Sequence, residues 1–391
     1  MKYIDQVTIS HKRVLVRVDY NVSFTPSHQI ANDIRITSTL PTIKHLLQRD
    51  NQVILMTHLG RPHPKDRTPS LLPLVDALKH YLPQIPITFI PDFTSLLREN
   101  IRIPQGNDVI LLENIRFLEG EENNSKVFSK ELASLGDVYV NEAFSVSHRK
   151  AASVVGITDF LPSYGGLQFK KEVEAISHII KTPEKPFVCV LGGSKISTKI
   201  HLLEKLITLS DIILVGGALA NTFLAALGEK VGKSLIEKDK LNQAKALLGF
   251  AEKRQTSIIL PIDALIGSKD GKHVVTKLIS EISSSDTIYD IGPQSTAIFQ
   301  QALVRAKTVL WNGPVGLFEV NAYKKGTDSI YEAITTTPHV KSIVGGGDTL
   351  AALTHKRHLD HISHISTGGG ALLEFIEKGT LPGIVALEKS L

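Results

Sequence analysis

Short apolar runs alternate with helical patterns along the whole chain, and no other feature restricts the fold as strongly. In the first half, β-rich runs occur at residues 13–18, 53–56, 87–90, 109–112 and 138–140, with helical spacing at 34–48, 72–82 and 127–135. Such alternation is typical of an α/β fold in which helices cover both faces of a parallel sheet. Because ligands of such sheets bind outside the carboxyl ends of the strands, we look for functional residues there.

The second half repeats the pattern, with expected strands at residues 187–191, 212–215, 257–260, 309–310, 342–344 and 364–366. A chain of 391 residues is too long for one core. Between the halves, residues 164–181 have helical spacing, and Pro162 and Pro183 flank them as helix breakers. We therefore predict domains at 1–163 and 183–380, joined by a linking hinge helix at 164–182.

Polar and basic residues follow the expected strands of the first half. They are Asp19, Asn21, His58, Leu59, Gly60, Arg61, Arg116 and Arg149, and Arg35 opens the helix after the first strand. Taken singly, each arginine is more often a surface ion-pair former. Together at one sheet edge they predict a pocket for an anion with a phosphate and a carboxylate, since the guanidinium fork pairs with both groups.

Glycines follow four expected strands of the second half, at 192–193, 216–217, 345–347 and 368–370. Glycine lets backbone amides approach an anion closely, so these turns predict a site for an extended anion such as a nucleotide polyphosphate. Lys195 and Lys199 lie four residues apart and share one helical face. Asp348 can hold Mg²⁺ or cap a helix, and Thr349 can donate a hydroxyl to phosphate.

Composition excludes several classes of function. The 44 Lys and Arg against 39 Asp and Glu leave a net charge of +5, too small an excess at this length to predict a nucleic-acid partner. The single cysteine, Cys189, permits no disulfide within the chain, as in a reducing compartment. The start of the chain has no apolar core, and glycines interrupt the longest apolar stretch at 212–228, so we expect a cytoplasmic protein without a membrane partner.

Histidines recur every three residues at His355, His358, His361 and His364. On an α-helix a three-residue step drifts around the cylinder, and the segment leads into an expected strand, so we interpret the repeat as no metal site. The spacing of cysteine and histidine matches no zinc motif. The chain also lacks a Gly-x-Gly-x-x-Gly sequence, which weakens a nicotinamide-dependent dehydrogenase as an alternative function.

Seven motifs occur in order along the chain: 13–21 (RVLVRVDYN), 58–62 (HLGRP), 112–117 (LENIRF), 191–195 (LGGSK), 311–316 (WNGPVG), 345–349 (GGGDT) and 366–370 (STGGG). In sequence and order they resemble those of the phosphoglycerate kinase family, along essentially the whole chain. The resemblance implies a monomer of two Rossmann-like domains and a hinge that closes for turnover. It also implies that residues 381–391 return to the first domain.

The resemblance further implies a role for each matching residue. The first domain would bind 3-phosphoglycerate or 1,3-bisphosphoglycerate through Asp19, Asn21, Arg35, His58, Leu59, Gly60, Arg61, Arg116 and Arg149. The second would bind ATP or ADP through Lys199, Gly217, Asn312, Pro314, Glu319, Gly346, Gly347, Asp348 and Thr349, with Mg²⁺ on Asp348. Arg35 and Lys195 would stabilise the phosphoryl group in transfer.

The chain departs from the family pattern in two places. Glu142 stands where the family usually has aspartate and Ser145 where it has glycine, in the loop that carries Arg149. Residues 215–218 read Val-Gly-Gly-Ala where the family has Gly-Gly-Gly-Met. The altered loop supports one alternative, a non-catalytic phosphometabolite-binding or adhesion protein that retains the fold.

Overall fold

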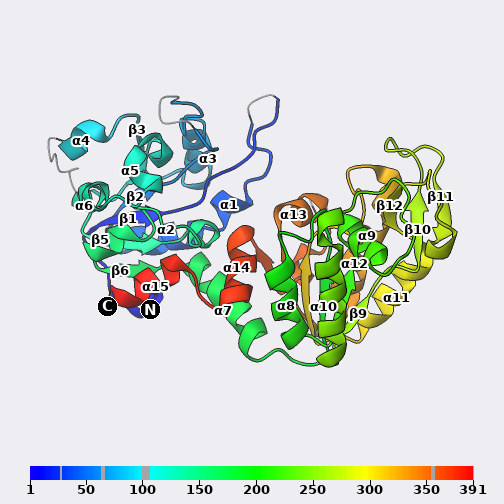
Figure 1. Ribbon diagram of the computed structural model, residues 1–391. Helices are drawn as coiled ribbons and strands as arrows, with labels where there is room; N and C mark the ends of the chain where they lie inside the picture. Colours follow the sequence, from blue (N-terminus) through cyan, green and yellow to red (C-terminus); the bar gives the residue numbers. More distant parts are fainter. Residues whose placement is uncertain (27–28, 63–66, 99–105, 354–356, 391) are drawn as a thin grey trace. The chain divides into compact units, whose positions relative to one another are not determined.

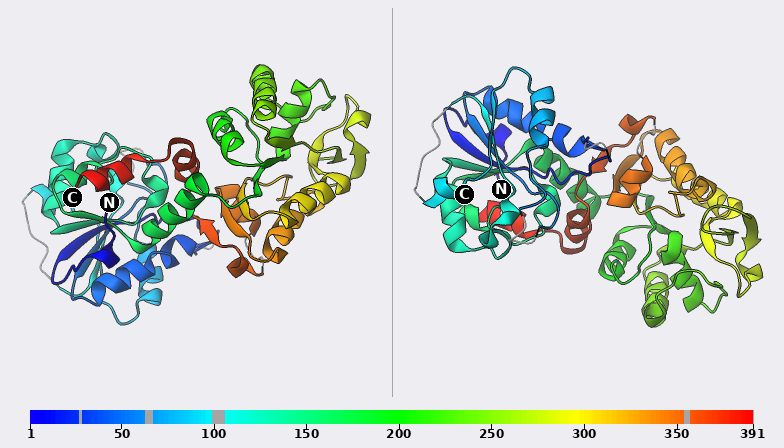
Figure 2. Two further views of the ribbon diagram at one scale, coloured as in Figure 1. Left: turned by 90° about the horizontal axis from the view of Figure 1, so that it is seen from below. Right: turned by 90° about the horizontal axis from the view of Figure 1, so that it is seen from above.

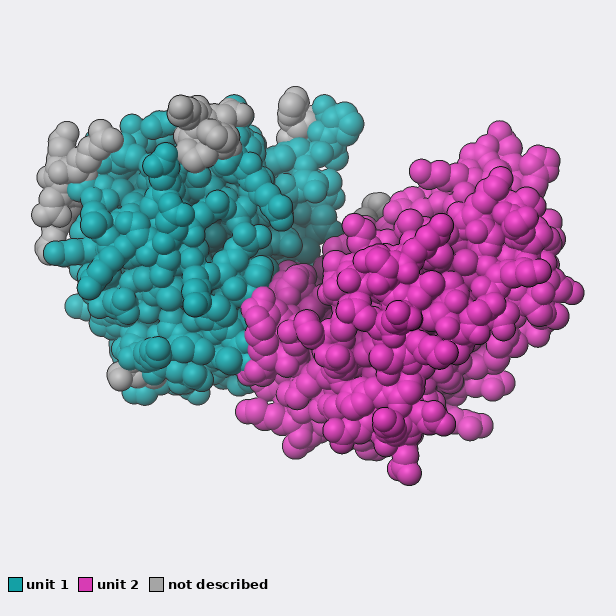
Figure 3. All heavy atoms as spheres, viewed as in Figure 1, with its two compact units in different colours: residues 1–174, 380–391 teal, residues 175–379 magenta. Residues whose placement is uncertain are grey.

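The computed structural model describes residues 1–26, 29–62, 67–98, 106–353 and 357–390. The chain divides into two compact units, which Figure 3 shows in different colours. Unit 1 comprises residues 1–174 and 380–391, and unit 2 comprises residues 175–379. The boundary between them falls within the helix α7 (Leu167–Lys181).

Unit 1 is built on a six-stranded sheet in the order β3-β4-β2-β1-β5-β6, and all of its pairings are parallel. The strands are β1 (Arg13–Arg17), β2 (Gln52–Met56), β3 (Ile87–Ile90), β4 (Val109–Leu112), β5 (Val138–Asn141) and β6 (Ser163–Gly165). Four of them, β1, β2, β4 and β5, are buried along their whole length, as expected of strands covered on both faces. The strand order reverses at β1, which has β2 on one side and β5 on the other.

Helices cover both faces of this sheet (Figures 1 and 2). They are α1 (Ile34–Thr37), α2 (Leu40–Leu47), α3 (Leu74–Tyr81), α4 (Thr94–Arg98), α5 (Glu119–Glu122), α6 (Lys126–Ser134) and α15 (Pro382–Lys389). The 3₁₀ turns are η1 (Ile4–Gln6), η2 (Ile115–Phe117), η3 (Phe144–Val146) and η4 (Gly156–Asp159). The C-terminal helix α15 is attached through the Gly383 amide, which donates to Ser147 O at 2.8 Å.

Unit 2 contains a second six-stranded parallel sheet, in the order β15-β14-β13-β7-β8-β9. Its strands are β7 (Phe187–Leu191), β8 (Ile212–Val215), β9 (Ser257–Ile259), β13 (Thr308–Asn312), β14 (Lys341–Gly345) and β15 (His364–Ser366). The order reverses at β7, which lies between β8 and β13. The predicted α/β fold with two parallel sheets is confirmed.

The helices of unit 2 also lie on both faces of its sheet (Figure 2). They are α8 (Ile200–Leu209), α9 (Gly217–Ala226), α10 (Leu241–Lys253), α11 (Pro293–Val304), α12 (Lys325–Thr336), α13 (Gly347–Leu353) and α14 (Gly370–Lys378). Four 3₁₀ turns connect them, η5 (Lys238–Lys240), η6 (Ile279–Glu281), η7 (Asn321–Tyr323) and η8 (Leu359–His361). Among the residues described in either unit, no helix is both long and apolar enough to span a membrane.

The structure differs from the predicted elements in three places. The helix expected at 34–48 is two helices, because Pro41 has no N–H for the carbonyl of Thr37 and its ring clashes with it. The linking helix begins at Leu167 rather than 164, since Ser163–Gly165 pairs with β5 as β6. A small antiparallel sheet of β10 (Asp263–Ile266), β11 (Val275–Leu278) and β12 (Ile288–Ile291) was not predicted.

The turns after β7 and β13 meet at the point where the strand order of unit 2 reverses. The Gly193 amide donates to Pro314 O at 3.0 Å, and the Gly192 amide donates to Asn312 O at 3.0 Å. A Cβ added at Gly192 would lie 2.0 Å from Pro314 O, a backbone atom that cannot move aside. Only glycine therefore fits at position 192.

Gly192→Ala is expected to destabilise unit 2 by about 1–3 kcal/mol, the usual cost of overpacking. As a control, Gly249→Ala in α10 meets nothing within 4 Å and should stabilise the same unit by about 0.5–1 kcal/mol, through helix propensity. Urea unfolding followed by the fluorescence of Trp311, the single tryptophan and a buried residue of β13, measures both changes. Equal midpoints for the two variants would contradict the packing argument.

Candidate functional site

Asp19 lies at the centre of a polar site at the carboxyl edge of the unit 1 sheet. It follows β1, and its side chain is largely buried. Its carboxylate accepts hydrogen bonds from the Arg35 guanidinium in α1 and from the hydroxyl of Ser145 in η3. It also accepts the backbone N–H of Asn21 at 3.1 Å. The residues that follow β1 and β5 therefore meet at the point where the strand order reverses.

His58 follows β2 and is buried beside this carboxylate. Its Nδ1 lies 3.3 Å from Arg17 Nη2 and 3.8 Å from Asp19 Oδ1. Since a guanidinium only donates, Nδ1 accepts and Nε2 carries the proton. Burial, together with the positive charges of Arg17, Arg116, Arg35 and Arg149, holds the pKa of His58 well below its usual range. The imidazole is therefore a neutral donor rather than a cation at neutral pH.

Arg116 extends the site on the side of β4. Its Nη1 donates to Gly60 O at 2.6 Å, and its Nε lies 3.7 Å from Glu122 Oε1. Burial, with repulsion from Arg17 and Arg149, lowers the pKa of Arg116 to about 10. The unfavourable positive charge shows that this region attracts an anion.

The other predicted residues of unit 1 lie in the same region. The Gly60 amide donates to Asn21 Oδ1 at 2.8 Å, and Leu59 is buried with its carbonyl accepting from Asn114 Nδ2 at 2.8 Å. Arg61 and Arg149 have exposed side chains. The electrostatic effect of Arg149 on both His58 and Arg116 places its charge near the two buried groups.

Sequence reasoning missed Arg17 and the hydroxyl of Ser145. Arg17 is almost wholly buried at the end of β1, where its Nε donates to Ser153 Oγ at 2.9 Å. Ser153 in turn donates to Glu121 Oε1 at 2.6 Å, so a buried carboxylate balances the guanidinium through the serine. The available signal was an arginine in an otherwise apolar strand, which requires a buried polar partner.

Glu142 connects the end of β5 to the start of α7. Its carboxylate oxygens accept the backbone N–H groups of Gln168 and Phe169, each at 3.1 Å, and so cap the helix. Burial raises the pKa of Glu142 to about 7, while these hydrogen bonds act in the opposite direction. The side chain that departs from the family pattern is thus used to fix α7.

Unit 2 carries a second site at the carboxyl edge of its sheet, with Lys199 beside the turn after β7. Lys199 Nζ donates to Gly192 O at 2.6 Å and to Asn312 Oδ1 at 2.9 Å. Burial lowers the pKa of Lys199 to about 8, and the charge of Asp348 acts in the opposite direction. The ammonium is therefore close to the carboxylate at the start of α13.

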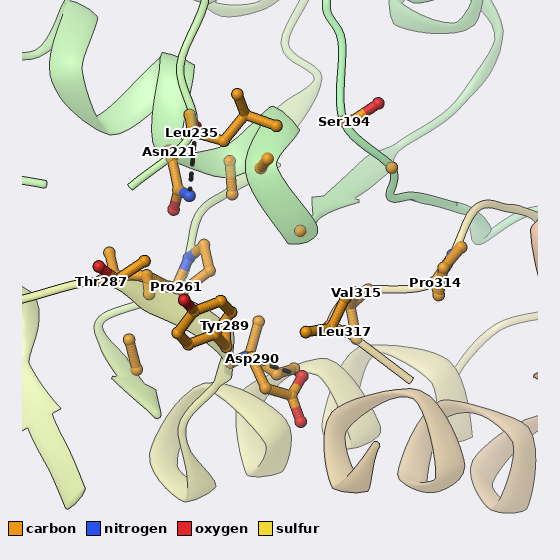
Figure 4. A pocket seen from close by; sticks show the side chains of 18 of the residues that line it. Ser194, Asn221, Leu235, Pro261, Thr287, Tyr289, Asp290, Pro314, Val315 and Leu317 are labelled. Carbon is orange, nitrogen blue, oxygen red and sulfur yellow. Dashed lines mark hydrogen bonds between the residues drawn. The ribbon is translucent and has the colours of Figure 1, made fainter. Parts of the chain in front are cut away.

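A cavity of about 480 Å³ opens beside these residues (Figure 4). Of the predicted nucleotide-binding residues, Gly217, Pro314, Glu319 and Asp348 line it. Sequence reasoning missed its apolar walls, to which Leu235, Tyr289, Val315 and Leu317 contribute. A cavity with largely apolar walls and a few polar groups, Glu319 and Asp348 among them, suits a flat base attached to a charged tail. Lys195 is exposed and does not line it.

The turn from β14 into α13 completes the polar end of this site. Gly346 has a φ of +108°, and a Cβ there would lie 2.7 Å from Asn312 Nδ2. Thr349 is buried, and its hydroxyl accepts the Gly313 amide at 2.7 Å and donates to Gly345 O at 3.0 Å. The threonine and Asn312 therefore brace the turn, while Gly347 and Asp348 are exposed at the helix start.

The residues present fit a hard divalent cation bound together with an anionic ligand. Asp348, at the start of α13, has an exposed side chain and is one of the residues that line the cavity. Mg²⁺ prefers one or two carboxylates plus substrate phosphates over a full set of protein ligands. A single protein carboxylate is thus sufficient for such a cation.

Comparisons with known proteins agree along nearly the whole chain. Residues 4–379 match the profile of the phosphoglycerate kinase family. A phosphoglycerate kinase of Thermus thermophilus is 44% identical over 379 residues, which is 96% of this chain and 97% of that protein. The enzyme of Dictyoglomus turgidum is 42% identical over 381 residues, 96% of each chain.

Solved structures give the same result. The structure of phosphoglycerate kinase from Coxiella burnetii superposes with a TM-score of 0.89 at 37% identity, and covers 99% of this chain and 98% of that one. The crystal structure of phosphoglycerate kinase from Pyrococcus horikoshii has a TM-score of 0.84 at 29% identity. The match covers 100% of this chain and 99% of that one.

His58 is expected to stay uncharged as the pH falls from 7.5 to 5.5, and NMR titration of its ring signals measures this directly. Because folding lowers its pKa, the unfolded chain binds a proton below about pH 6.5 that the folded chain does not. The free energy of unfolding is therefore higher at pH 7.5, where His58 is neutral in both states, and it decreases as the pH falls and the unfolded chain takes up the proton. Wild type should therefore lose more stability than His58→Gln over this range; the reverse order would contradict the assignment.

Proposed function

The chain belongs to the phosphoglycerate kinase family, and from this membership we propose how its residues carry out the reaction of that family. The protein transfers a phosphoryl group to and from a carboxyl group, between 1,3-bisphosphoglycerate and ADP, to give 3-phosphoglycerate and ATP. The observation that carries this conclusion is the match at 41–44% identity along almost the full length of curated phosphoglycerate kinases. The step belongs to glycolysis.

In this proposal unit 1 is the 3-phosphoglycerate-binding domain. Asp19 and Asn21 hold the glycerate, and Arg35 exchanges its ion pair with Asp19 for the reacting carboxylate. His58, Arg61, Arg116 and Arg149 bind the 3-phosphate, with Leu59 and Gly60 shaping the loop. Burial and, after it, repulsion from neighbouring arginines lower the pKa of both His58 and Arg116, which supports this assignment, because an incoming anion offsets the repulsion.

Unit 2 is proposed as the nucleotide-binding domain. The apolar end of the cavity takes the base beside Gly217 and Pro314, and Glu319 binds the ribose. Lys199, Asn312 and the amides of 346–349 hold the phosphates, with Mg²⁺ on Asp348. The bound cation supplies positive charge to the phosphate oxygens in transfer.

Transfer of this kind needs in-line positioning and positive charge more than covalent help from the protein. We assign Arg35 and Lys195 to the phosphoryl group in flight. Lys195 is exposed, which suits a group that meets its target only when the substrates approach. Since the two sites belong to different units, turnover requires bending around α7, which spans the unit boundary. We further propose that the protein works as a monomer in the cytoplasm.

Lys195→Ala and Arg35→Ala are each expected to lower kcat about 100-fold or more, the scale for removal of one preorganised electrostatic donor. The assay follows ATP-dependent phosphorylation of 3-phosphoglycerate through NADH oxidation by coupled glyceraldehyde-3-phosphate dehydrogenase. Lys245→Ala, on the exposed face of α10, removes a lysine outside both sites and should keep the wild-type rate. A wild-type rate in Lys195→Ala or Arg35→Ala would remove that residue from the mechanism.

Ser145→Ala tests whether the hydroxyl bound to Asp19 keeps that carboxylate in place to bind the substrate. A hydrogen bond to a charged group contributes about 1.5–3 kcal/mol, so KM for 3-phosphoglycerate should rise about 10- to 100-fold, with KM for ATP unchanged. The same coupled assay gives both constants. An unchanged KM for 3-phosphoglycerate would show that Asp19 keeps its position without the serine.

A further inference from the structure

The histidine repeat near the end of unit 2 does not form an α-helix. Residues 359–361 are the 3₁₀ turn η8, and His358 is its N-cap residue. The drift of a three-residue step around an α-helix, the reason for setting the repeat aside, does not apply here, because residues 359–361 are a 3₁₀ turn and His358 precedes it with a left-handed backbone. His355 lies outside the described residues.

His358 and His361 are brought together with Asp360 at the surface. One ligand atom from each of the three residues lies within 4.8 Å of the others, and the two imidazole centroids are 5.2 Å apart. All three side chains are exposed, so an ion can reach them from solvent. Tetrahedral Zn²⁺ with bonds of about 2.0–2.1 Å places its ligands roughly 3.4 Å apart, a separation that small rotations of these side chains provide.

Neighbouring contacts orient the group for coordination. His361 Nδ1 lies 2.9 Å from Thr335 O, and because a carbonyl only accepts, Nδ1 carries the proton and Nε2 presents its lone pair. Metal-binding histidines are usually held in this way by an outer carbonyl or carboxylate. Tyr331 donates to Arg357 O just before the turn, and Ile362 is buried just after it. Both ends of the turn are thus fixed to the core of unit 2.

The backbone of His358 also favours a fixed direction for its side chain. Its φ is +63°, in the left-handed region that side-chain-bearing residues seldom adopt. The His361 amide donates to His358 O at 3.1 Å and closes the turn. The backbone therefore fixes the positions of the two Cβ atoms, and rotation of the side chains then directs the imidazoles to an ion.

We propose that His358, Asp360 and His361 form a binding site for a divalent transition metal ion of the Zn²⁺ class, with water as the fourth ligand. Two imidazoles and one carboxylate suit Zn²⁺, whereas Mg²⁺ prefers oxygen ligands alone. The site is separate from Asp348, and it does not depend on the proposed function.

The test is titration of the full chain, without an affinity tag, with Zn²⁺ by calorimetry in excess Mg²⁺, which occupies oxygen-only sites. We expect saturable binding of one Zn²⁺ per chain, and a visible absorption band when Co²⁺ replaces it. His358→Asn and His361→Asn should each weaken Zn²⁺ binding at least about tenfold, since loss of even an outer partner of a ligand costs 10–100-fold. Asparagine tolerates the left-handed backbone of position 358.

His273→Asn is the matched control, because His273 is also exposed and also has a positive φ, of +53°, but is no member of the cluster. It should leave the affinity for Zn²⁺ unchanged. Asp360→Asn keeps the shape of the turn and removes one ligand, so it serves if a histidine variant fails to fold, as judged by circular dichroism. The proposal would be overturned if Zn²⁺ binding to the wild type did not saturate, or if all four variants bound Zn²⁺ with the same affinity.

Discussion

The reversal of strand order at the first strand of each sheet is the constraint on which both candidate sites depend. Connections from β1 and β5, and likewise from β7 and β13, leave the carboxyl edge in opposite directions, so a crevice opens between them. In unit 1, Asp19 and Ser145 meet across that crevice, and in unit 2 the residues that meet are Gly193 and Pro314. The same reversal of strand order therefore positions the charged side chains of the unit 1 site and the glycine turns of the unit 2 site.

The two crevices attract anions by different means. In unit 1, guanidinium groups accumulate beyond what the nearby carboxylates neutralise, so burial and mutual repulsion lower the pKa of Arg116 and keep His58 neutral. In unit 2 the positive charge comes from the first turn of α13 and from the partly buried ammonium of Lys199. In unit 1, the arginines repel one another, and a multiply charged anion reduces that repulsion when it binds. In unit 2, backbone N–H groups beside the cavity serve as donors to the anion.

The positions of most strands were predictable, because continuous apolar runs bounded by glycine or charge mark fully buried parallel strands. The side-chain contacts within the two sites were harder to predict from the sequence. Arg17 and Asp19 are neighbours in sequence, yet Arg17 has its partner in Ser153 and Asp19 in Ser145, and only the fold brings these serines near. The sheet of β10, β11 and β12 escaped prediction because its members lack the continuous buried run of the parallel strands, and β11 is largely exposed. The local structure of the histidine repeat was also not predicted, since its spacing was tested against α-helical geometry and residues 359–361 form a 3₁₀ turn.

Glu142, which departs from the family pattern, has a structural role at the start of α7. Its side chain is one methylene longer than aspartate, and its carboxylate reaches the two free amides at the start of α7. Its own amide donates to Arg17 O at 2.9 Å, so the residue also continues the pairing of β5 with β1. The strand that leads to Ser145 and Arg149 is thereby attached to the helix that runs across the unit boundary. Burial raises the pKa of this carboxyl to about 7. Because a carboxylate accepts amide hydrogen bonds more strongly than a carboxylic acid does, protonation of Glu142 would weaken the cap.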